Sequence, residues 1–273
     1  MQKIPIFAAV KKMTDIIRPI ANELAQFEAF FEKTLHAQTE PMDNIMQYVH
    51  DTQGKRLRPI LVLLSAKLFG EINEQTLRSA TFVEMVHSAT LIHDDVVDDA
   101  NSRRKKASVK AQFGNLSAVL AGDYLLAQAM LLLSHPDDYA ILQEMLRTTA
   151  AMSEGELMQN NSVVRPFDRL RDLNYLDIIT RKTAMLMRSC CVAGALSVKA
   201  TPKQVQHIAD FGLLFGQLFQ MRDDILDGEN TEQAQALLPV YYEKTLQTLD
   251  SFAPSEITES LRELTVFCAE REI

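Results

Sequence analysis

The chain has 273 residues, of which 47% are hydrophobic and 23% are charged, and it contains only 9 Gly and 9 Pro. This composition indicates a helical globular protein with a sizeable core and argues against a disordered chain. The formal net charge of −8 disfavours nucleic acid as a partner, because phosphate backbones are bound by basic surfaces.

Hydrophobic residues recur at helical spacing through the first part of the chain. Helices are expected at residues 13–35, from Pro41 to about residue 49, at residues 60–69 after a basic turn at 54–59, and from about residue 75 into the acidic residues 94–99. A basic segment at residues 101–106 follows and is predicted to be a loop.

The helical rhythm continues through the second part of the chain. Helices are predicted at residues 116–133, 141–159, 173–198 and 204–226, with a Pro-containing connector at 163–167 and a pair of amphipathic helices at 234–271 broken at Pro254. No alternating β pattern of useful length and no Gly/Ser-rich linker is present. We therefore expect one all-α domain over residues 1–273.

The cysteine content and the apolar runs bear on the location of the protein. Cys190, Cys191 and Cys268 form no Cys-x-x-Cys pair, and an odd number of cysteines disfavours a disulfide framework. The apolar run at residues 4–10 lacks the layout of a cleaved signal peptide, and no run approaches the ~20 apolar residues that span a bilayer. We therefore expect a cytoplasmic protein without a membrane span.

Two acidic blocks of the same spacing, Asp-Asp-x-x-Asp, end two of the predicted helices. In the first, Asp94 and Asp98 are four residues apart, as are Asp95 and Asp99, so each pair shares one helical face and its charges repel. The second block consists of Asp223, Asp224 and Asp227. Mg²⁺ prefers oxygen ligands and is usually held by one or two carboxylates together with phosphates. Facing blocks could therefore clamp a metal-bound diphosphate, whereas a single block is more often a solvated helix end.

Basic residues accompany both blocks. Lys55, Arg56 and Arg58 stand beside a predicted helix start, where free backbone N–H groups favour anions. Arg103 and Arg104 follow the first block, and Lys182 with Thr183 lies within a later helix. Guanidinium groups match phosphate oxygens in bidentate fashion. Each cluster alone could be a solvated surface charge, but three clusters beside two acidic blocks suit the binding of two diphosphates.

Two residues near these motifs keep more than one interpretation. His87 lies two helical turns before Asp94 and could be either a phosphate donor or a core histidine. With Glu84 it also spells the Glu-x-x-His unit of di-iron bundles, although no second unit is present. Gln220 could be an ordinary helix amide or could point its oxygen at a developing positive charge.

These motifs occur in the order seen in the trans-isoprenyl (polyprenyl) diphosphate synthases, which the chain resembles from about residue 54 to residue 227. The resemblance implies the all-α isoprenoid synthase fold, a single helical bundle around a deep central cavity, usually in a homodimer. It also implies Mg²⁺-dependent head-to-tail 1′-4 condensation of isopentenyl diphosphate with an allylic diphosphate.

The resemblance assigns a role to individual residues of this sequence. Asp94 and Asp98 would coordinate two Mg²⁺ ions and Asp223 a third, while Asp95, Asp224 and Asp227 would orient ligands as a second shell. The remaining residues are as follows: Arg103 and Lys182 would bind the allylic diphosphate, Lys55, Arg58, His87 and Arg104 would hold isopentenyl diphosphate, and Thr183 and Gln220 would lie near the allylic carbon.

Small residues before the first block predict a long product. Ala89 and Thr90 lie about 6–8 Å below Asp94 by helical rise, and Phe82, about 18 Å below it, is a candidate floor of the tunnel or a core residue. An aromatic side chain near Ala89 would stop growth early. We expect a product longer than C20, of about C30 to C45, and a shorter one from Ala89→Phe or Ala89→Tyr.

One departure from the family pattern keeps alternatives open. The family follows its second block with a Gly-Lys-x-x-Gly-x-Asp loop, whereas this chain passes from Asp227 through Gly228-Glu229-Asn230 almost directly into the next helix. The alternatives are a short-chain C15 or C20 synthase, a regulatory subunit of a heteromeric synthase, a terpene cyclase, and a helical bundle with incidental acids.

Overall fold

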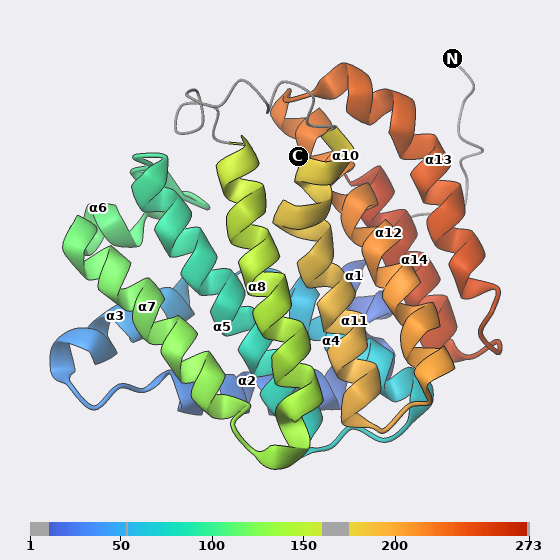
Figure 1. Cartoon of the computed structure of the whole chain (residues 1–273), viewed down its shortest axis with the longest axis horizontal. Helices are drawn as coiled ribbons and strands as arrows, with labels where there is room; N and C mark the ends of the chain where they lie inside the picture. Colours follow the sequence, from blue (N-terminus) through green and yellow to red (C-terminus); the bar gives the residue numbers. More distant parts are fainter. Residues whose placement is uncertain (1–10, 53, 160–174, 272–273) are drawn as a thin grey trace.

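The computed structural model describes residues 11–52, 54–159 and 175–271 of the chain. Helices make up almost all of this part, and the long ones run side by side through the molecule (Figure 1). The elements are α1 (Met13–Ile16), η1 (Arg18–Ile20), α2 (Ala21–Leu35), α3 (Glu40–Asp51), α4 (Leu57–Phe69), α5 (Glu74–Val97), β1 (Ser102–Arg103), β2 (Lys106–Ala107), α6 (Val109–Phe113), α7 (Asn115–Leu132), η2 (Pro136–Asp138), α8 (Tyr139–Gln159), α10 (Tyr175–Ile179), η4 (Thr180–Ala184), α11 (Met185–Ser197), α12 (Pro202–Asp227), α13 (Thr231–Leu249) and α14 (Glu256–Glu270). The expected all-α architecture is confirmed.

Helix α11 lies at the centre and packs against α4, α5, α8 and α12. Its side chains are mostly small or flexible, and most of them are buried. A Cβ atom at Gly194 would lie 2.3 Å from the carbonyl oxygen of Val62 in α4, so only glycine allows the two helices to approach this closely. The close approach positions α4, whose first turn carries Arg58.

The N-terminal helix predicted at residues 13–35 is instead broken into α1, η1 and α2. Pro19 causes the break, because proline lacks the backbone N–H that an α-helix interior requires. Beyond it, α2 buries Phe27 and Phe31 against the core.

The basic segment predicted as a loop forms a short antiparallel hairpin, in which Ser102 pairs with Ala107 and Arg103 with Lys106. Arg104 and Lys105 at its turn have φ of 51° and 65°, as the tightest hairpin turns require. Because the hairpin turns back toward the end of α5, it brings Arg103 beside the first acidic block.

The second half follows the predicted helices closely. Helix α12 begins with a capping box between Thr201 and Gln204 and ends at Gly228, whose φ of 77° suits a residue that terminates a helix. Residues 228–230 alone connect α12 to α13, and α13 and α14 are separated around Pro254 as expected. The connector predicted at residues 163–167 and the start of the helix predicted at 173 lie outside the described residues.

Helix α7 departs from the expectation that no segment could span a membrane. Its length and composition would allow it to cross a membrane, since its mean hydropathy is 1.3, and only 28% of it is buried in the protein. One such helix is weak evidence for a span. Its exposed apolar side chains are Leu116, Val119, Leu120, Met130 and Leu131.

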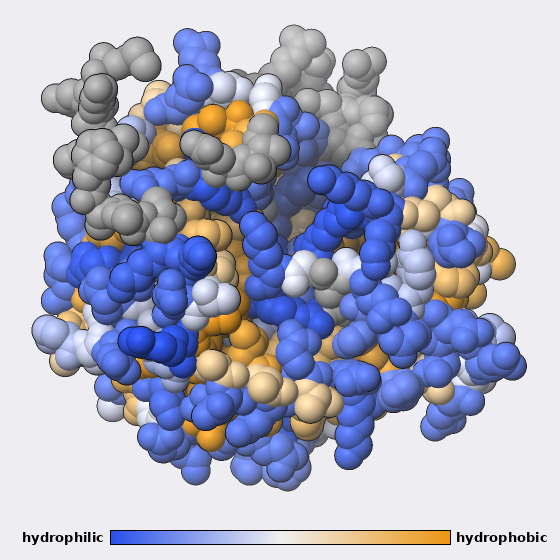
Figure 2. Space-filling view, turned by 180° about the vertical axis from the view of Figure 1, so that it is seen from behind, coloured by the Kyte–Doolittle hydropathy of each residue, from blue (hydrophilic) through white to orange (hydrophobic). Residues whose placement is uncertain are grey.

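The face opposite to the view of Figure 1 is largely hydrophilic (Figure 2), as is typical of amphipathic helices around a core. Seen from behind, it is hollowed near its middle, and hydrophobic residues are visible between the hydrophilic side chains there (Figure 2).

Candidate functional site

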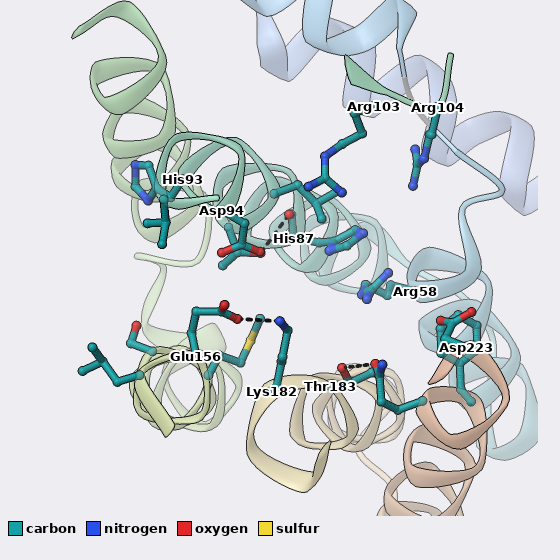
Figure 3. A pocket seen from close by; sticks show the side chains of 18 residues that line it. Arg58, His87, His93, Asp94, Arg103, Arg104, Glu156, Lys182, Thr183 and Asp223 are labelled. Atoms are coloured by element: carbon teal, nitrogen blue, oxygen red, sulfur yellow. Dashed lines mark hydrogen bonds and ion pairs between the residues drawn. The ribbon is translucent and has the colours of Figure 1, made fainter. Parts of the chain in front are cut away.

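A cavity of about 550 Å³ lies between the ends of α5, α8 and α12 and the η4 turn. Charged side chains of both signs converge on it from these elements, from the first turn of α4 and from the hairpin (Figure 3). The charged residues that line it are Asp94, Glu156, Asp223, Arg58, Arg103, Arg104 and Lys182. Its apolar wall is formed by Leu91, Val97, Met152, Leu157 and Phe219.

The first acidic block ends α5, and its four carboxylates divide into two pairs. Asp95 is buried and accepts from Arg103 at 2.8 and 2.7 Å, and Asp99 forms an ion pair with Lys110. Asp94 lines the cavity, whereas Asp98 is exposed at the helix end. Neither Asp94 nor Asp98 makes an ion pair with any described residue, so this pair is left to face an external cation.

Burial is the main reason that the pKa of Asp94 is raised to about 6, and the nearby carboxylate of Glu156 raises it further. Lys182 and Arg103 oppose this shift. A carboxylate with a pKa raised by burial and a neighbouring charge is typical of a functional site.

The second block lies at the end of α12. Asp223 faces the cavity and forms an ion pair with Arg271, just beyond the end of α14. Burial raises the pKa of Asp223, and Arg271 opposes the shift. Asp224 is buried and accepts from the Tyr175 hydroxyl at 2.5 Å and from the Gln220 amide at 2.8 Å. Asp227 is exposed. In each block the first aspartate therefore faces the cavity and the second is held by neighbours.

Lys182 and Thr183 project into the cavity from η4, a π-helical turn. Single π turns within helices are frequent at functional sites. The Lys182 ammonium lies 2.8 Å from Glu156, and the Thr183 hydroxyl donates to the Gln220 side-chain oxygen at 2.7 Å. A Cβ atom at Gly155 would lie 2.7 Å from the backbone nitrogen of Lys182, so this glycine allows α8 to pack directly against η4.

The guanidinium groups of Arg58 and Arg104 lie with the His87 ring at one end of the cavity. The Arg58 Nε atom is buried and has no hydrogen-bond partner. Burial, followed by the charges of Arg58, Arg104 and Arg103, lowers the pKa of His87 well below its usual value. An anion here would supply the negative charge that these guanidinium groups lack.

Arg56 is a structural residue, although it stands in the same basic turn. Its guanidinium donates to Glu28 at 2.8 Å and to the buried Glu84 at 3.1 Å, and it lies over the Phe31 ring. This ion pair also occupies Glu84, which argues against the di-iron interpretation of Glu84 and His87.

Four other predicted site residues have distinct positions. Lys55 lies outside the lining of the cavity, with its ammonium 5.8 Å from the centre of the Phe267 ring. Thr90 lines the cavity. Ala89 and Phe82 are buried in the core and do not line it.

Among the residues to which sequence reasoning assigned no role, Glu156 lines the cavity together with His93 and Ser153, and Arg271 pairs with Asp223. Glu156 is one of several acidic residues on an amphipathic helix, and Arg271 is one of several charges near the end of the chain. Nothing in either local pattern marks them, because each is brought to the site only by helix packing.

The donor set suits a divalent cation that is shared with a bound anion. No three His, Cys, Asp or Glu side chains within the described ranges lie close enough to hold a metal by themselves. Mg²⁺ does not require such a cluster, since it is commonly held by one or two carboxylates plus phosphate oxygens. Asp94 and Asp223 supply the carboxylates, and the surrounding cations suit the phosphates.

Comparisons with known proteins agree with this geometry. The sequence model of the Polyprenyl synthetase family matches residues 39–236. An all-trans-nonaprenyl-diphosphate synthase of Rhodobacter capsulatus is 35% identical over 220 residues, covering 80% of this chain and 67% of that protein. Component 2 of the heptaprenyl diphosphate synthase of Geobacillus stearothermophilus is 34% identical over 215 residues, covering 78% of this chain and 66% of that protein.

A similar structure is that of a polyprenyl synthase from Caulobacter crescentus, complexed with calcium and isoprenyl diphosphate. Its TM-score is 0.87 at 25% sequence identity, and the match covers 97% of this chain and 99% of that chain. The curated relatives are longer, and this chain spans about two thirds of their length or less.

The first prediction concerns the stability of the site. Replacing Asp94 by Asn should stabilise the ligand-free protein at pH 7.5 by about 1–2 kcal/mol, because it removes a half-buried charge next to Glu156. The raised pKa of about 6 means that the penalty is present above pH 6 and absent near pH 4. Urea unfolding should therefore show that Asp94→Asn has a higher free energy of unfolding than the wild type at pH 7.5, and that this difference is smaller at pH 4.5. An equal gain at both values would contradict the prediction.

Proposed function

The chain belongs to the polyprenyl synthetase family, and from this premise we propose that it is a trans-prenyltransferase. The proposed reaction is head-to-tail 1′-4 condensation of isopentenyl diphosphate with an allylic diphosphate, giving an all-trans polyprenyl diphosphate. We also propose that residues 1–273 act as one synthase domain.

One observation carries the proposal. The first aspartates of two acidic blocks, 129 residues apart, line the same cavity together with four cationic side chains. Two diphosphates with their metal ions need both kinds of charge, since carboxylates hold the metal ions and cationic side chains bind the phosphate oxygens.

The proposed roles of the residues follow from their positions. Arg103 and Lys182 would bind the allylic diphosphate next to Asp94, whereas Arg58, His87 and Arg104 would bind isopentenyl diphosphate at the cationic end. Lys55 would reach this second substrate only by leaving the Phe267 ring. Asp95, Asp224 and Asp227 would orient ligands and bound water, as the hydrogen bonds of Asp95 and Asp224 support.

The chemistry depends on ionisation in a dry site. Asp94, Asp98 and Asp223 would hold three Mg²⁺ ions, whose charge assists departure of diphosphate from the allylic carbon. The Thr183 and Gln220 oxygens would lie near the positive charge that develops on this carbon. Leu91, Met152 and Phe219 would exclude water from it, so that the double bond of isopentenyl diphosphate is the nucleophile that attacks. The cation that results would lose a proton to the released diphosphate.

The decisive experiment is incubation of the purified chain with labelled isopentenyl diphosphate, Mg²⁺ and allylic primers of several lengths. We expect condensation that disappears in Asp94→Ala and Asp223→Ala. If no primer is extended, the chain is better explained as a subunit of a heteromeric synthase. The missing loop after Asp227 and the similarity to one component of a two-component synthase make this the second candidate.

The product is proposed to be longer than C20, in agreement with the octaprenyl and nonaprenyl synthases among the relatives. Because Thr90 lines the cavity, Thr90→Tyr should shorten the product by filling it. Ala89→Phe was expected from the sequence to do the same, but Ala89 is fully buried, so this variant should mainly destabilise the protein, by about 1–3 kcal/mol. Product chromatography and thermal unfolding separate the two effects; unchanged products from Thr90→Tyr would refute the proposed path of chain growth.

We also propose a homodimer that covers the apolar face of α7. This face exposes Leu116, Leu120 and Leu131 to 75%, 50% and 64%, which is more than isolated surface residues explain. Leu120→Glu should therefore shift the protein from dimer to monomer in light scattering. The matched control is Val240→Glu on α13, where the residue is 49% exposed and the mass should not change. A dimer that persists in Leu120→Glu would place the interface elsewhere.

A cytoplasmic location is proposed as well. Cys190, Cys191 and Cys268 are all buried free thiols, which suits a reducing compartment.

A further inference from the structure

Two charged residues with no role in the proposed reaction are ion-paired to residues that have one. Glu156 of α8 pairs with Lys182, and Arg271 after α14 pairs with Asp223. In both pairs, the partner is a side chain to which ligand binding is assigned above. The charge of Glu156 has the sign of a diphosphate, and the charge of Arg271 has the sign of a metal ion.

Glu156 occupies the position that an anion would take at Lys182. The two charged groups are 2.8 Å apart and are 24% and 29% exposed, and both line the cavity (Figure 3). Gly155 brings α8 close to η4 at this point, so the packing of these two elements places Glu156 next to Lys182. A partly hydrated pair of this kind is weak, and a diphosphate carries enough charge to displace it.

Arg271 occupies the position that a cation would take at Asp223. Its guanidinium lies 4.1 Å from the centre of the Phe219 ring, and its carbonyl accepts from the Arg222 guanidinium at 3.0 and 2.5 Å. Its Nε atom is nevertheless buried without a hydrogen-bond partner. The guanidinium is therefore stacked and paired but not fully satisfied, and its contacts with Phe219 do not depend on Asp223.

The ion pairs of Glu156 with Lys182 and of Arg271 with Asp223 neutralise two charges in the ligand-free cavity. Lys182 and Asp223 are both partly shielded from water, with 29% and 32% of their side chains exposed, and a partly shielded charge without a partner is unfavourable. We propose that Glu156 and Arg271 are internal counter-ions, which hold Lys182 and Asp223 in place in the empty cavity and are displaced when a diphosphate and a divalent cation bind. This inference rests on the proposed function of the cavity, and it makes both residues positioning residues that compete with the ligands.

The proposal makes opposite predictions for the two residues. Glu156→Gln should strengthen the binding of inorganic pyrophosphate by about three- to tenfold, because Lys182 becomes available, and should weaken Mg²⁺ binding. Arg271→Gln should strengthen Mg²⁺ binding by a similar factor, because Asp223 becomes available, and should weaken pyrophosphate binding. These factors correspond to roughly 0.6–1.4 kcal/mol. A merely structural role would weaken the binding of both ligands.

Isothermal titration of the full chain tests these predictions without turnover. Pyrophosphate is titrated in the presence of a chelator, and Mg²⁺ is titrated in the absence of pyrophosphate. Glu154→Gln and Arg262→Gln are the matched controls. Glu154 lies on α8 like Glu156, and Arg262 lies on α14, which Arg271 follows; they form ion pairs with Arg181 and Asp250 respectively, outside the cavity lining. Both controls should leave the two affinities unchanged.

A double-mutant cycle identifies the partner. In a Lys182→Met background, Glu156→Gln should no longer strengthen pyrophosphate binding, because the competition is for this ammonium. Persistence of the full effect, or weakened binding of both ligands in the single variants, would overturn the proposal. Wild-type protein that binds neither ligand would overturn the proposed function together with it. If the wild-type protein binds both ligands but the two variants do not shift the affinities in opposite directions, only the counter-ion proposal would be overturned.

Discussion

The structure depends on placing two groups of like charge opposite each other in a cavity with an apolar wall. Asp94 and Asp223 end separate helices and face the same space, where the low dielectric strengthens any repulsion or attraction. Burial raises the pKa of both carboxylates. The helices around them must therefore be held together by other interactions, and the packing of α11 against α4, α8 and α12 supplies these.

Within each acidic block, the first and second aspartates have different surroundings. The second aspartate of each block is buried and held by hydrogen bonds, by Arg103 in the first and by Tyr175 in the second. This arrangement stiffens the helix end, while the first aspartate keeps its oxygens toward the cavity. A metal ligand needs this combination of a fixed backbone and an available carboxylate, and the resemblance of the two ends suits a ligand that bridges them.

Much of this architecture was predictable from the local sequence. Helical periodicity located most of the helices within a few residues, and the two blocks and the Lys182-Thr183 pair were recognisable by their spacing. The errors have physical causes. Pro19 broke a helix that apolar spacing made continuous, and the hairpin after α5 was taken for a loop because two-residue strands have no periodicity to detect. Ala89, which is predicted to line the tunnel, is buried in the core and does not line the described cavity.

The sequence by itself determined the all-α class, the family and the identity of the acidic and basic residues, since these depend on local spacing and composition. Only the tertiary structure decided which carboxylate of each block faces the cavity and which charged side chains form ion pairs with the residues of the site. Arg271 reaches Asp223 across 48 residues of chain, and Glu156 reaches Lys182 from another helix. Periodicity defines the face of a helix on which a side chain lies, but the neighbour that this face meets is set by how the helices pack.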